Sequence, residues 1–307
     1  MGAVIIGWGT ALPAKVVTND DLCQYLDTSD QWIRERTGIL ERRVGGTTSG
    51  LAIEAGRKAM EVAAIDPASI DLLILATMTP DQAAPATASV VQDALGLKCG
   101  AFDLNAACAG FTYAFVTAHG YLSLGYKRVL VIGVDTLSRI VDWNDRSTAV
   151  LFGDGAGAVV LEAVEGPGQM RGWHLDCDGS AASSLYADIG SHIKMDGKEV
   201  FRRAVRVMIE SSERSLAMAG ITADQVSLLV PHQANIRIVE AATERLGISM
   251  ERTSLVLHRT GNTSSASIPL ALVQAINDGR VHDGDYLLLV GFGAGMTVAS
   301  AVIRWGR

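Results

Sequence analysis

The chain repeats one pattern of helix, turn and buried strand. The segment Ile65–Ile74 (IDPASIDLLI) aligns without a gap with Ile221–Val230 (ITADQVSLLV). Each segment follows an amphipathic stretch, at residues 50–64 and 200–219, whose apolar spacing predicts a helix. A repeat of this kind indicates a duplicated fold, in which two similar units pack together and bury their apolar faces.

The predicted elements have the same order in both halves. In the first half we expect strands near residues 70–77, 99–105 and 127–135, with helices near 86–95 and 108–124. In the second half we expect strands near 226–231, 253–257 and 285–291, with helices near 234–246 and 264–278. Apolar strands that alternate with helices are typical of parallel sheets covered on both faces. The sequence therefore predicts an α/β protein of five layers, α-β-α-β-α, with halves at residues 1–166 and 167–307 joined near Glu165–Gly168.

Composition excludes several classes of function. The net charge of −7 argues against nucleic acid as the main partner. The four cysteines show neither zinc-ligand spacing nor a disulfide framework, so we expect no metal and a reducing cytoplasm. The start, MGAVIIGWGT, lacks a basic leader and is interpreted as a first strand. No apolar run approaches the roughly 18 residues that a membrane span needs, so we expect no membrane partner.

Reactive side chains follow the predicted strands. Cys108 lies in a run of small residues where a strand leads into a helix, and the helix dipole there favours thiolate over thiol. His232 and Asn262 follow strands of the second half. Taken singly, each has an ordinary structural interpretation: a buried cysteine, a hydrogen-bonded histidine and a Gly-Asn turn. Because equivalent loops of two packed halves converge at their interface, we expect the three side chains to form one site.

Four motifs together resemble a known family. They are AACAG at Cys108, PHQAN at His232, GNTS at Asn262, and the glycine loop Gly291–Gly295 (GFGAG). In this order they resemble the thiolase superfamily and, more narrowly, the β-ketoacyl-acyl-carrier-protein synthase III family, over essentially the whole chain. The segments 27–38 and 152–157 are further landmarks of that family. The resemblance implies a thiolase-like duplicated fold.

The resemblance also implies an acyltransferase that starts fatty-acid synthesis. Cys108 takes an acyl group from acyl-CoA, and malonyl-acyl carrier protein then loses CO2 and condenses with it. Coenzyme A thioester and malonyl-acyl carrier protein are substrates, and no permanent cofactor is expected. His232 and Asn262 would donate hydrogen bonds to the enolate and so serve decarboxylation more than acylation. The backbone N–H groups of Cys108 and Ala294 would hold the tetrahedral oxyanion.

Binding residues follow from the same resemblance. The positions that match the coenzyme A tunnel are Thr28, Trp32, Arg36, Arg146 and Arg237, with Trp32 and Arg146 on either side of the adenine. Lys198 stands where the family often has Asn at the tunnel wall. Carrier-protein docking is assigned to Arg202, Arg203, Arg206 and Arg237, a basic patch on an acidic chain. The alternative is a solvated helix face with no partner.

The acyl pocket is assigned to Ala84, Phe111 and Met296 of a homodimer. In the family, position 84 reaches into the pocket of the partner subunit, and short-chain members often carry a bulky aromatic there. Alanine leaves that volume empty, so we expect longer or branched primers, unless Phe111, Phe115 or Met296 refills the space.

Three other functions compete. One is a synthase-III-like acyltransferase or condensing enzyme of polyketide or specialised metabolism. A non-catalytic partner subunit would have lost the nucleophile, which is present. A nucleotide-binding dehydrogenase is disfavoured because the segment 7–12 (GWGTAL) lacks the third glycine of the dinucleotide fingerprint.

Overall fold

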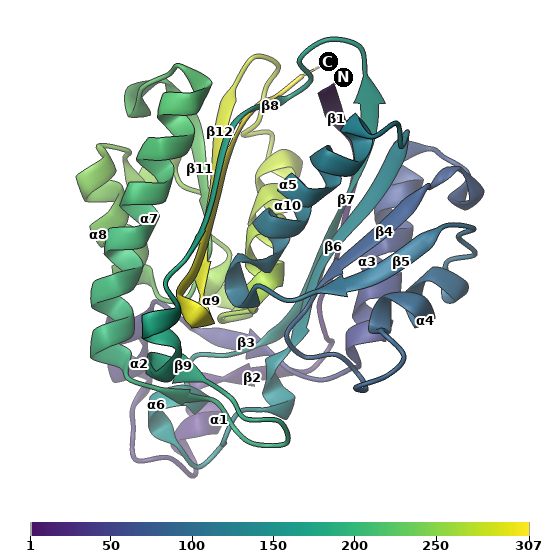
Figure 1. Cartoon of the computed structure of the whole chain (residues 1–307). Helices are drawn as coiled ribbons and strands as arrows, with labels where there is room; N and C mark the ends of the chain where they lie inside the picture. Colours follow the sequence, from purple (N-terminus) through teal and green to yellow (C-terminus); the bar gives the residue numbers. More distant parts are fainter. Residues whose placement is uncertain (1, 307) are drawn as a thin grey trace.

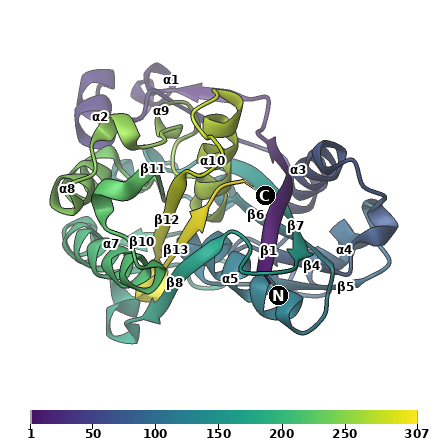
Figure 2. The same cartoon turned by 90° about the horizontal axis from the view of Figure 1, so that it is seen from above.

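Two β-sheets stand side by side, with helices between them and on both outer faces (Figures 1 and 2). The structure is a computed structural model and describes residues 2–306. The first sheet has the order β1 (Gly2–Ala11), β7 (Asp154–Val164), β6 (Arg128–Thr136), β4 (Leu72–Ala76) and β5 (Gly100–Leu104). The second has the order β11 (Val226–Pro231), β12 (Tyr286–Gly293), β13 (Thr297–Arg304) and β8 (Met170–Cys177).

The helices complete five layers. Between the sheets lie α5 (Gly110–Ser123) and α10 (Ser267–Asn277). The outer face of the first sheet carries α3 (Thr48–Ala63) and α4 (Thr87–Ala94), and that of the second carries α7 (Gly197–Ala219) and α8 (Ile236–Leu246). Apolar side chains of the two central helices, including Phe111, Phe115 and Leu272, share one core with strands of both sheets. The predicted α-β-α-β-α architecture is confirmed.

The prediction that the sheets are parallel is wrong, because both are mixed. In the first sheet β4 runs parallel to β5 and β6, whereas β7 is antiparallel to β1 and β6. In the second, β11 and β12 are parallel, but β12–β13 and β13–β8 are antiparallel. Only Ala294–Met296 separates β12 from β13. A connection of that length can form a hairpin but cannot make the crossover that a parallel neighbour requires.

The strand expected near residues 253–257 is also absent from the second sheet. Thr253 forms one isolated bridge to Leu229, and α9 (Leu257–Thr260) begins four residues further on. The side chain of Gln233 replaces a neighbouring strand here, since its Oε1 accepts from Val256 N at 2.8 Å and from Leu257 N at 2.9 Å. The backbone donors are therefore satisfied without a sheet partner.

Capping residues determine where the helices that frame the site begin. Asp196 caps α7 by accepting from the backbone N–H groups of Lys198 and Glu199, both at 3.1 Å. Asn235 caps α8 by accepting from Arg237 N at 2.9 Å. These side chains satisfy N–H groups that have no partner within the first turn of a helix.

Short elements close one end of the two sheets, at the bottom of Figure 1. They are β2 (Val16–Thr18), β3 (Glu41–Arg43), β9 (Leu185–Tyr186), β10 (Lys194–Met195), α1 (Asn19–Cys23), α2 (Asp30–Thr37) and α6 (Arg146–Ala149). A separate apolar core that includes Leu22, Ile33 and Leu257 holds this end together.

Short 3₁₀ turns occur along the chain. They are η1 (Pro67–Ser69), η2 (Ala107–Ala109), η3 (Leu137–Arg139), η4 (Gly179–Ser184), η5 (Ala223–Gln225), η6 (Met250–Arg252), η7 (Ser264–Ala266) and η8 (Ala294–Met296).

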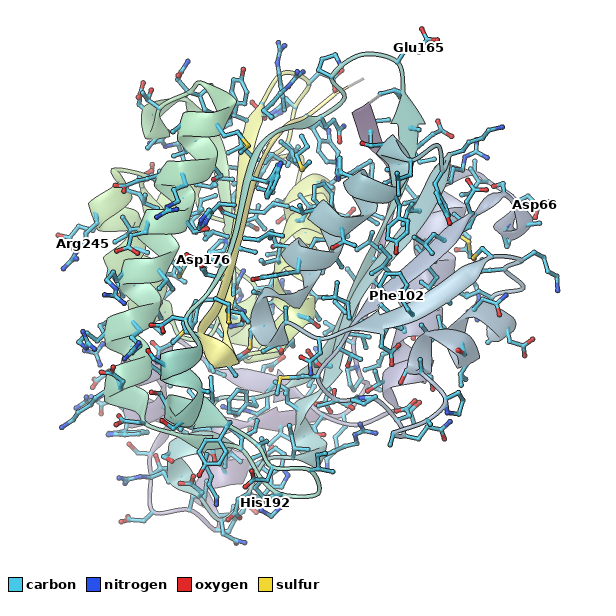
Figure 3. All side chains as sticks on the ribbon, viewed as in Figure 1. Asp66, Phe102, Glu165, Asp176, His192 and Arg245 are labelled. Atoms are coloured by element: carbon cyan, nitrogen blue, oxygen red, sulfur yellow. The ribbon has the colours of Figure 1, made fainter. Side chains whose placement is uncertain are left out.

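The chain crosses from the first sheet to the second in the turn between Val164 and Met170. Glu165 projects from this turn at the opposite end of the molecule from the short elements (Figure 3). The proposed division into residues 1–166 and 167–307 falls within it. Among residues 2–306, no helix combines the length and the apolar character needed to cross a bilayer.

Candidate active site

Cys108 lies at a sharp turn between β5 and α5. It belongs to η2, and α5 begins two residues later at Gly110. Ala107, just before it, has a φ of 47°, in the left-handed region that costs energy for a residue with a side chain. The end of β12 lies against this turn, because a Cβ added at Gly293 would be only 2.5 Å from Cys108 N. Glycine is therefore required at position 293.

Burial dominates the ionisation of Cys108. The residue is 7% exposed, and burial raises the pKa of its thiol to about 12. The negative charge of Asp135 acts in the same direction, whereas a hydrogen bond from the Ser264 side chain opposes it. Burial therefore opposes the helix dipole that the sequence predicted to favour a thiolate, and it favours the thiol form of Cys108.

His232 follows β11 and is held on three sides. Its backbone N donates to Val290 O at 2.7 Å, its Nδ1 lies 2.7 Å from Ser267 Oγ, and its ring meets Phe292 edge-on with centroids 5.2 Å apart. Burial lowers the pKa of the imidazole to about 3, so the ring is neutral near neutral pH. Its Nε2 is buried without a hydrogen-bond partner among the described residues.

Asn262 is fixed by its backbone and by its own amide oxygen. Its N donates to Leu151 O at 2.8 Å, and its O accepts from Gly153 N at 2.9 Å. The side-chain Oδ1 accepts from Ser264 N at 2.9 Å. This contact directs the amide oxygen toward Ser264, and the Nδ2 group, which has no hydrogen-bond partner among residues 2–306, can donate to a ligand.

Asp135 joins the Asn262 loop to the other half of the molecule. It is fully buried at the end of β6, and its Oδ2 accepts from Ser265 N at 3.1 Å and Ser265 Oγ at 2.8 Å. Its Oδ1 accepts from Thr77 Oγ1, Met78 N and Thr79 Oγ1 at 2.8–3.0 Å. Sequence reasoning missed Asp135, Ser264 and Ser267. An aspartate at the end of the apolar run VLVIGVDT was the one signal that could have revealed Asp135.

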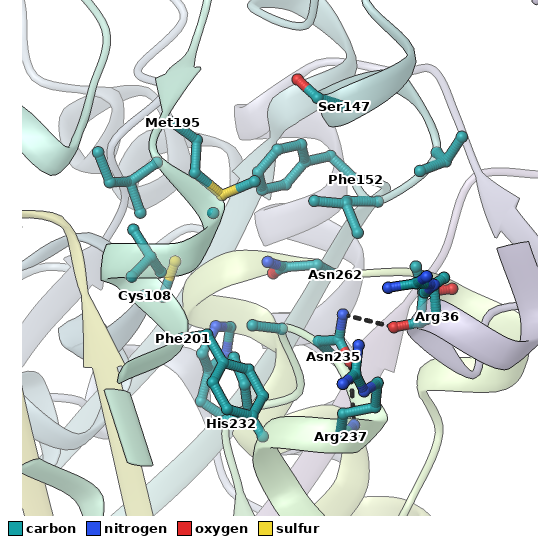
Figure 4. A pocket seen from close by; sticks show the side chains of 18 of the residues that line it. Arg36, Cys108, Ser147, Phe152, Met195, Phe201, His232, Asn235, Arg237 and Asn262 are labelled. Atoms are coloured by element: carbon teal, nitrogen blue, oxygen red, sulfur yellow. Dashed lines mark hydrogen bonds between the residues drawn. The ribbon is translucent and has the colours of Figure 1, made fainter. Parts of the chain in front are cut away.

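The structure brings the three predicted catalytic residues together. Cys108, His232 and Asn262 line one cavity of about 510 Å³ (Figure 4). The charged residues that line it are Arg36, Lys198 and Arg237, and no described carboxylate does so. Asn235 joins two parts of this wall, since its Nδ2 donates to Arg36 O at 2.9 Å while its Oδ1 caps the helix at Arg237. The cavity therefore suits an anionic ligand that reaches the Cys108 thiol.

The predicted coenzyme A residues divide into two groups. Trp32, Arg36 and Arg237 line the cavity. Arg146 lies beside it, with its guanidinium 4.9 Å from the centre of the Trp32 ring and Nη1 donating to Asp27 O at 2.7 Å. Thr28 does not line the cavity, and its Oγ1 is buried without a partner among residues 2–306.

A second cavity, of about 810 Å³, reaches Cys108 from another side. Gln82, Ala83, Ile189 and Ala294 are among its lining residues. Of the predicted acyl-pocket residues, Phe111 lies in the core between the sheets and Met296 in the core under α7, and neither is among the residues that line these two cavities. Ala84 is exposed, next to Ala83 in the same loop.

The predicted docking arginines on α7 are partly engaged in ion pairs. Arg203 binds Glu199 and Asp178 and is mostly buried, whereas Arg202 is 64% exposed and pairs with Glu199 at 2.7 Å. Arg206 is 53% exposed and lies 4.0 Å from Glu210. Arg202 and Arg206 thus remain the accessible members of this patch. Elsewhere in residues 2–306, no group of three or more potential ligands could hold a metal ion.

The fold and the buried cysteine between its two halves define a thiolase-like condensing enzyme, a class of acyltransferases. Residues 102–179 match the family described as 3-oxoacyl-(acyl-carrier-protein) synthase III, and residues 216–305 match the C-terminal region of the same family. The chain belongs to the β-ketoacyl-acyl-carrier-protein synthase III family.

Individual relatives cover the full length of the chain. It is 52% identical to β-ketoacyl-(acyl-carrier-protein) synthase III 1 of Bacillus anthracis, with 100% of both chains covered. The crystal structure of 3-oxoacyl-(acyl-carrier-protein) synthase III from Aquifex aeolicus superposes with a TM-score of 0.97 at 45% identity, covering 99% of this chain and 100% of that one. The priming β-ketosynthase of the R1128 polyketide pathway has a TM-score of 0.95 at 35% identity, covering 100% and 97%.

Proposed function

We propose that the protein condenses an acyl-CoA primer with malonyl-acyl carrier protein to give β-ketoacyl-acyl carrier protein, coenzyme A and CO2, the first condensation of fatty-acid synthesis. The observation that carries this proposal is the convergence of Cys108, His232 and Asn262 in one cavity whose charged wall is cationic. Full-length identity of 52% to a synthase III supports the choice of reaction.

In the first half-reaction Cys108 is the nucleophile. Acyl-CoA binds with its phosphates toward Arg36, Lys198 and Arg237. Its adenine stacks on Trp32 and Arg146, whose 4.9 Å contact opens to admit the base between them. Cys108 Sγ attacks the thioester carbon, and the backbone N–H groups of Cys108 and Ala294 stabilise the tetrahedral oxyanion. Coenzyme A leaves, and the acyl group extends toward the second cavity.

In the second half-reaction the malonyl thioester loses CO2 and forms an enolate. Asn262 Nδ2 donates a hydrogen bond to the enolate oxygen, and the His232 ring lies in the same cavity to donate another. No described carboxylate lines this cavity, so no acidic side chain protonates the carbanion before it reacts. The carbanion attacks the acyl thioester and releases Cys108.

The fuller assembly that we propose is a homodimer in the cytoplasm, with no permanently bound cofactor. Acyl carrier protein docks near the cavity mouth at Arg202, Arg203, Arg206 and Arg237. Arg237 also packs over the Phe201 ring at 5.8 Å, so it joins the docking surface to the cavity.

Mass spectrometry of the intact protein tests the reaction. Mixing with a panel of acyl-CoAs is expected to add one acyl group per chain, and peptide mapping is expected to place it on Cys108. Malonyl-acyl carrier protein should then remove it and release CO2. Cys108→Ala should fold but take no acyl group. Acylation of Cys23, Cys99 or Cys177 instead would disprove the assignment.

The 35% identity to a polyketide priming ketosynthase supports a second candidate, a priming condensation in polyketide synthesis. The chemistry is the same, and the carrier protein differs. Comparing fatty-acid and polyketide carrier proteins as malonyl donors separates the two: a strong preference for the polyketide carrier would favour the second.

A further inference from the structure

Ser267, the first residue of α10, connects the His232 ring to the Asn262 loop. Its Oγ lies 2.7 Å from His232 Nδ1 and 2.9 Å from the carbonyl oxygen of Ser264. All three residues are buried. A carbonyl oxygen can only accept a hydrogen bond, and a hydroxyl has one proton to donate. With its single proton donated to Ser264 O, the Ser267 hydroxyl can only accept at His232 Nδ1, from a proton on that nitrogen.

This arrangement leaves His232 Nε2 without a proton. The neutral imidazole carries a single N–H, and the contact with Ser267 places that proton on Nδ1. Nε2 is then a buried lone pair with no partner among the described residues. His232 and Cys108 line the same cavity, and Cys108 is protonated. The cavity is thus lined by a proton donor, the Cys108 thiol, and by an acceptor without a partner, His232 Nε2.

We propose that Ser267 is a positioning residue that holds His232 in the Nδ1–H tautomer, so that Nε2 takes the Cys108 proton during acylation. This inference rests on the proposed function. As Cys108 Sγ bonds to the acyl carbon, its proton moves to Nε2. As the bond from that carbon to the coenzyme A sulfur breaks, the proton passes to this sulfur and coenzyme A leaves as a thiol. The exchange of one thioester for another leaves no net charge in the buried cavity.

The same hydroxyl also serves the second half-reaction. To donate to the enolate, His232 must carry its proton on Nε2, and Nδ1 must then accept. The Ser267 hydroxyl can turn and donate to Nδ1, because the Ser264 carbonyl keeps the hydrogen bond from Ser267 N. His232 therefore acts in both half-reactions, whereas the sequence assigned it mainly to decarboxylation. Arg36, Lys198 and Arg237 are the charged residues that line this cavity. Asp135 acts on Cys108 from the loop side, and its carboxylate accepts from Thr77, Met78, Thr79 and Ser265.

Nuclear magnetic resonance of the full-length protein, labelled with ¹⁵N at its six histidines, tests the tautomer directly. The His232 signals are identified by their loss in His232→Gln. We expect a protonated Nδ1 and an unprotonated Nε2 in the wild type and in Ser267→Thr, and loss of this pattern in Ser267→Ala. Ser215→Ala is the matched control, because Ser215 is also buried and donates to a carbonyl three residues earlier, Ser212 O, at 3.0 Å. A protonated Nε2 in the resting wild type would overturn the inference.

Single-turnover acylation gives the functional measurement. Ser267→Ala is expected to release coenzyme A about tenfold to a hundredfold more slowly than the wild type near pH 7, the scale of a misplaced general base. Its rate should rise with pH, since hydroxide can then remove the thiol proton, and Ser267→Thr should restore most of the rate. An unchanged rate and pH profile in a folded Ser267→Ala protein would refute the proposal. If no acyl-CoA acylates even the wild type, the proposed function fails, and the tautomer measurement still stands.

Discussion

Cys108 and His232 are both buried in their neutral forms. Burial raises the pKa of the thiol to about 12 and lowers that of the imidazole to about 3, because each charged form would lose its hydration. A separated thiolate and imidazolium would therefore be costly in this buried cavity. A proton that moves while the bond to the acyl carbon forms avoids that cost, which is why the orientation of His232 matters for acylation.

The lowered pKa of His232 predicts a loss of stability in acid. The unfolded chain binds a proton at this imidazole below about pH 6.5, whereas the folded chain does so only near pH 3. The need to keep the His232 ring neutral therefore lowers the free energy of unfolding least above about pH 6.5, and stability is lost progressively as the pH falls from there toward 3. At about pH 4.5 the wild type should have lost about 2–3 kcal/mol through this residue.

Denaturant unfolding at about pH 7 and about pH 4.5 measures this effect. His232→Gln should lose less stability between the two values than the wild type does. His192→Gln is the control, because His192 is exposed. The difference between the two variants in unfolding free energy lost on acidification measures the effect of the buried His232 ring. If the wild type and His232→Gln lose the same unfolding free energy between the two pH values, the pKa of His232 is not lowered as we expect.

Among the elements of the fold, the loop from Asn262 to Ser267 organises the site. Through Ser264 it orients the Asn262 amide, and through Ser267 it holds the His232 ring. Its own position depends on Asp135 of β6, which binds Ser265. β6 can approach this closely because a Cβ at Gly133 would lie 2.5 Å from Ser265 O.

Asp135→Asn is expected to damage both stability and decarboxylation. One carboxylate oxygen becomes an NH2 group that faces buried donors, which should cost about 2–4 kcal/mol of unfolding free energy. The loosened loop should slow CO2 release from malonyl-acyl carrier protein more than acylation. Asp154→Asn is the matched control: Asp154 is equally buried, but its carboxylate accepts from Gly45 and Ser138, outside the loop. If both variants lower CO2 release to the same extent, the loop has no special role.

Helix α7 presents Arg202 and Arg206 to solvent, whereas Arg203 is held by Glu199 and Asp178. Replacing Arg202 and Arg206 by Glu should raise the KM for malonyl-acyl carrier protein several-fold, because the carrier protein is acidic, and leave the KM for acyl-CoA unchanged. Arg214→Glu, on the same helix, is the control. An unchanged KM for the carrier substrate would remove α7 from the docking surface.

On the scale of the whole molecule, Cys108 stands where two cavities meet. One leads past the cationic wall, and the other opens beside the loop that carries Ala83 and Ala84. Ala84 is exposed in the single chain, where a partner subunit would cover it in the proposed homodimer. The identity of this side chain would then set the depth of the partner's acyl pocket.

The small side chain of Ala84 predicts a preference for longer or branched primers over acetyl-CoA. Each further methylene that fits adds about 0.8 kcal/mol of burial. Ala84→Phe should shift the preference toward acetyl, while Ala84→Gly should leave it unchanged. A chain-length series of acyl-CoAs measures kcat/KM for each variant, with size-exclusion chromatography to establish the dimer. Acetyl preference in the wild type, or the same profile in Ala84→Phe, would rule the idea out.

Local patterns were sufficient to predict much of the molecule. The five layers and the group of Cys108, His232 and Asn262 follow from strand and helix spacing and from short motifs, which neighbouring residues determine. The antiparallel strands escaped prediction because strand direction depends on how distant segments pair. The structure places Phe111 and Met296, which were assigned to an acyl pocket, in apolar cores, and their part in that pocket stays a prediction.

The sequence by itself determined most of the elements and placed Cys108 and His232 after strands, because these features depend on side chains a few positions apart. The strand expected before Asn262 is replaced by α9. Only the tertiary structure decided the protonation of the site and the orientation of its side chains. Asp135 and Ser265 are 130 residues apart, and His232 and Ser267 are 35 apart. Burial, which sets the ionisation of Cys108 and His232, exists only after both sheets have closed over the central helices.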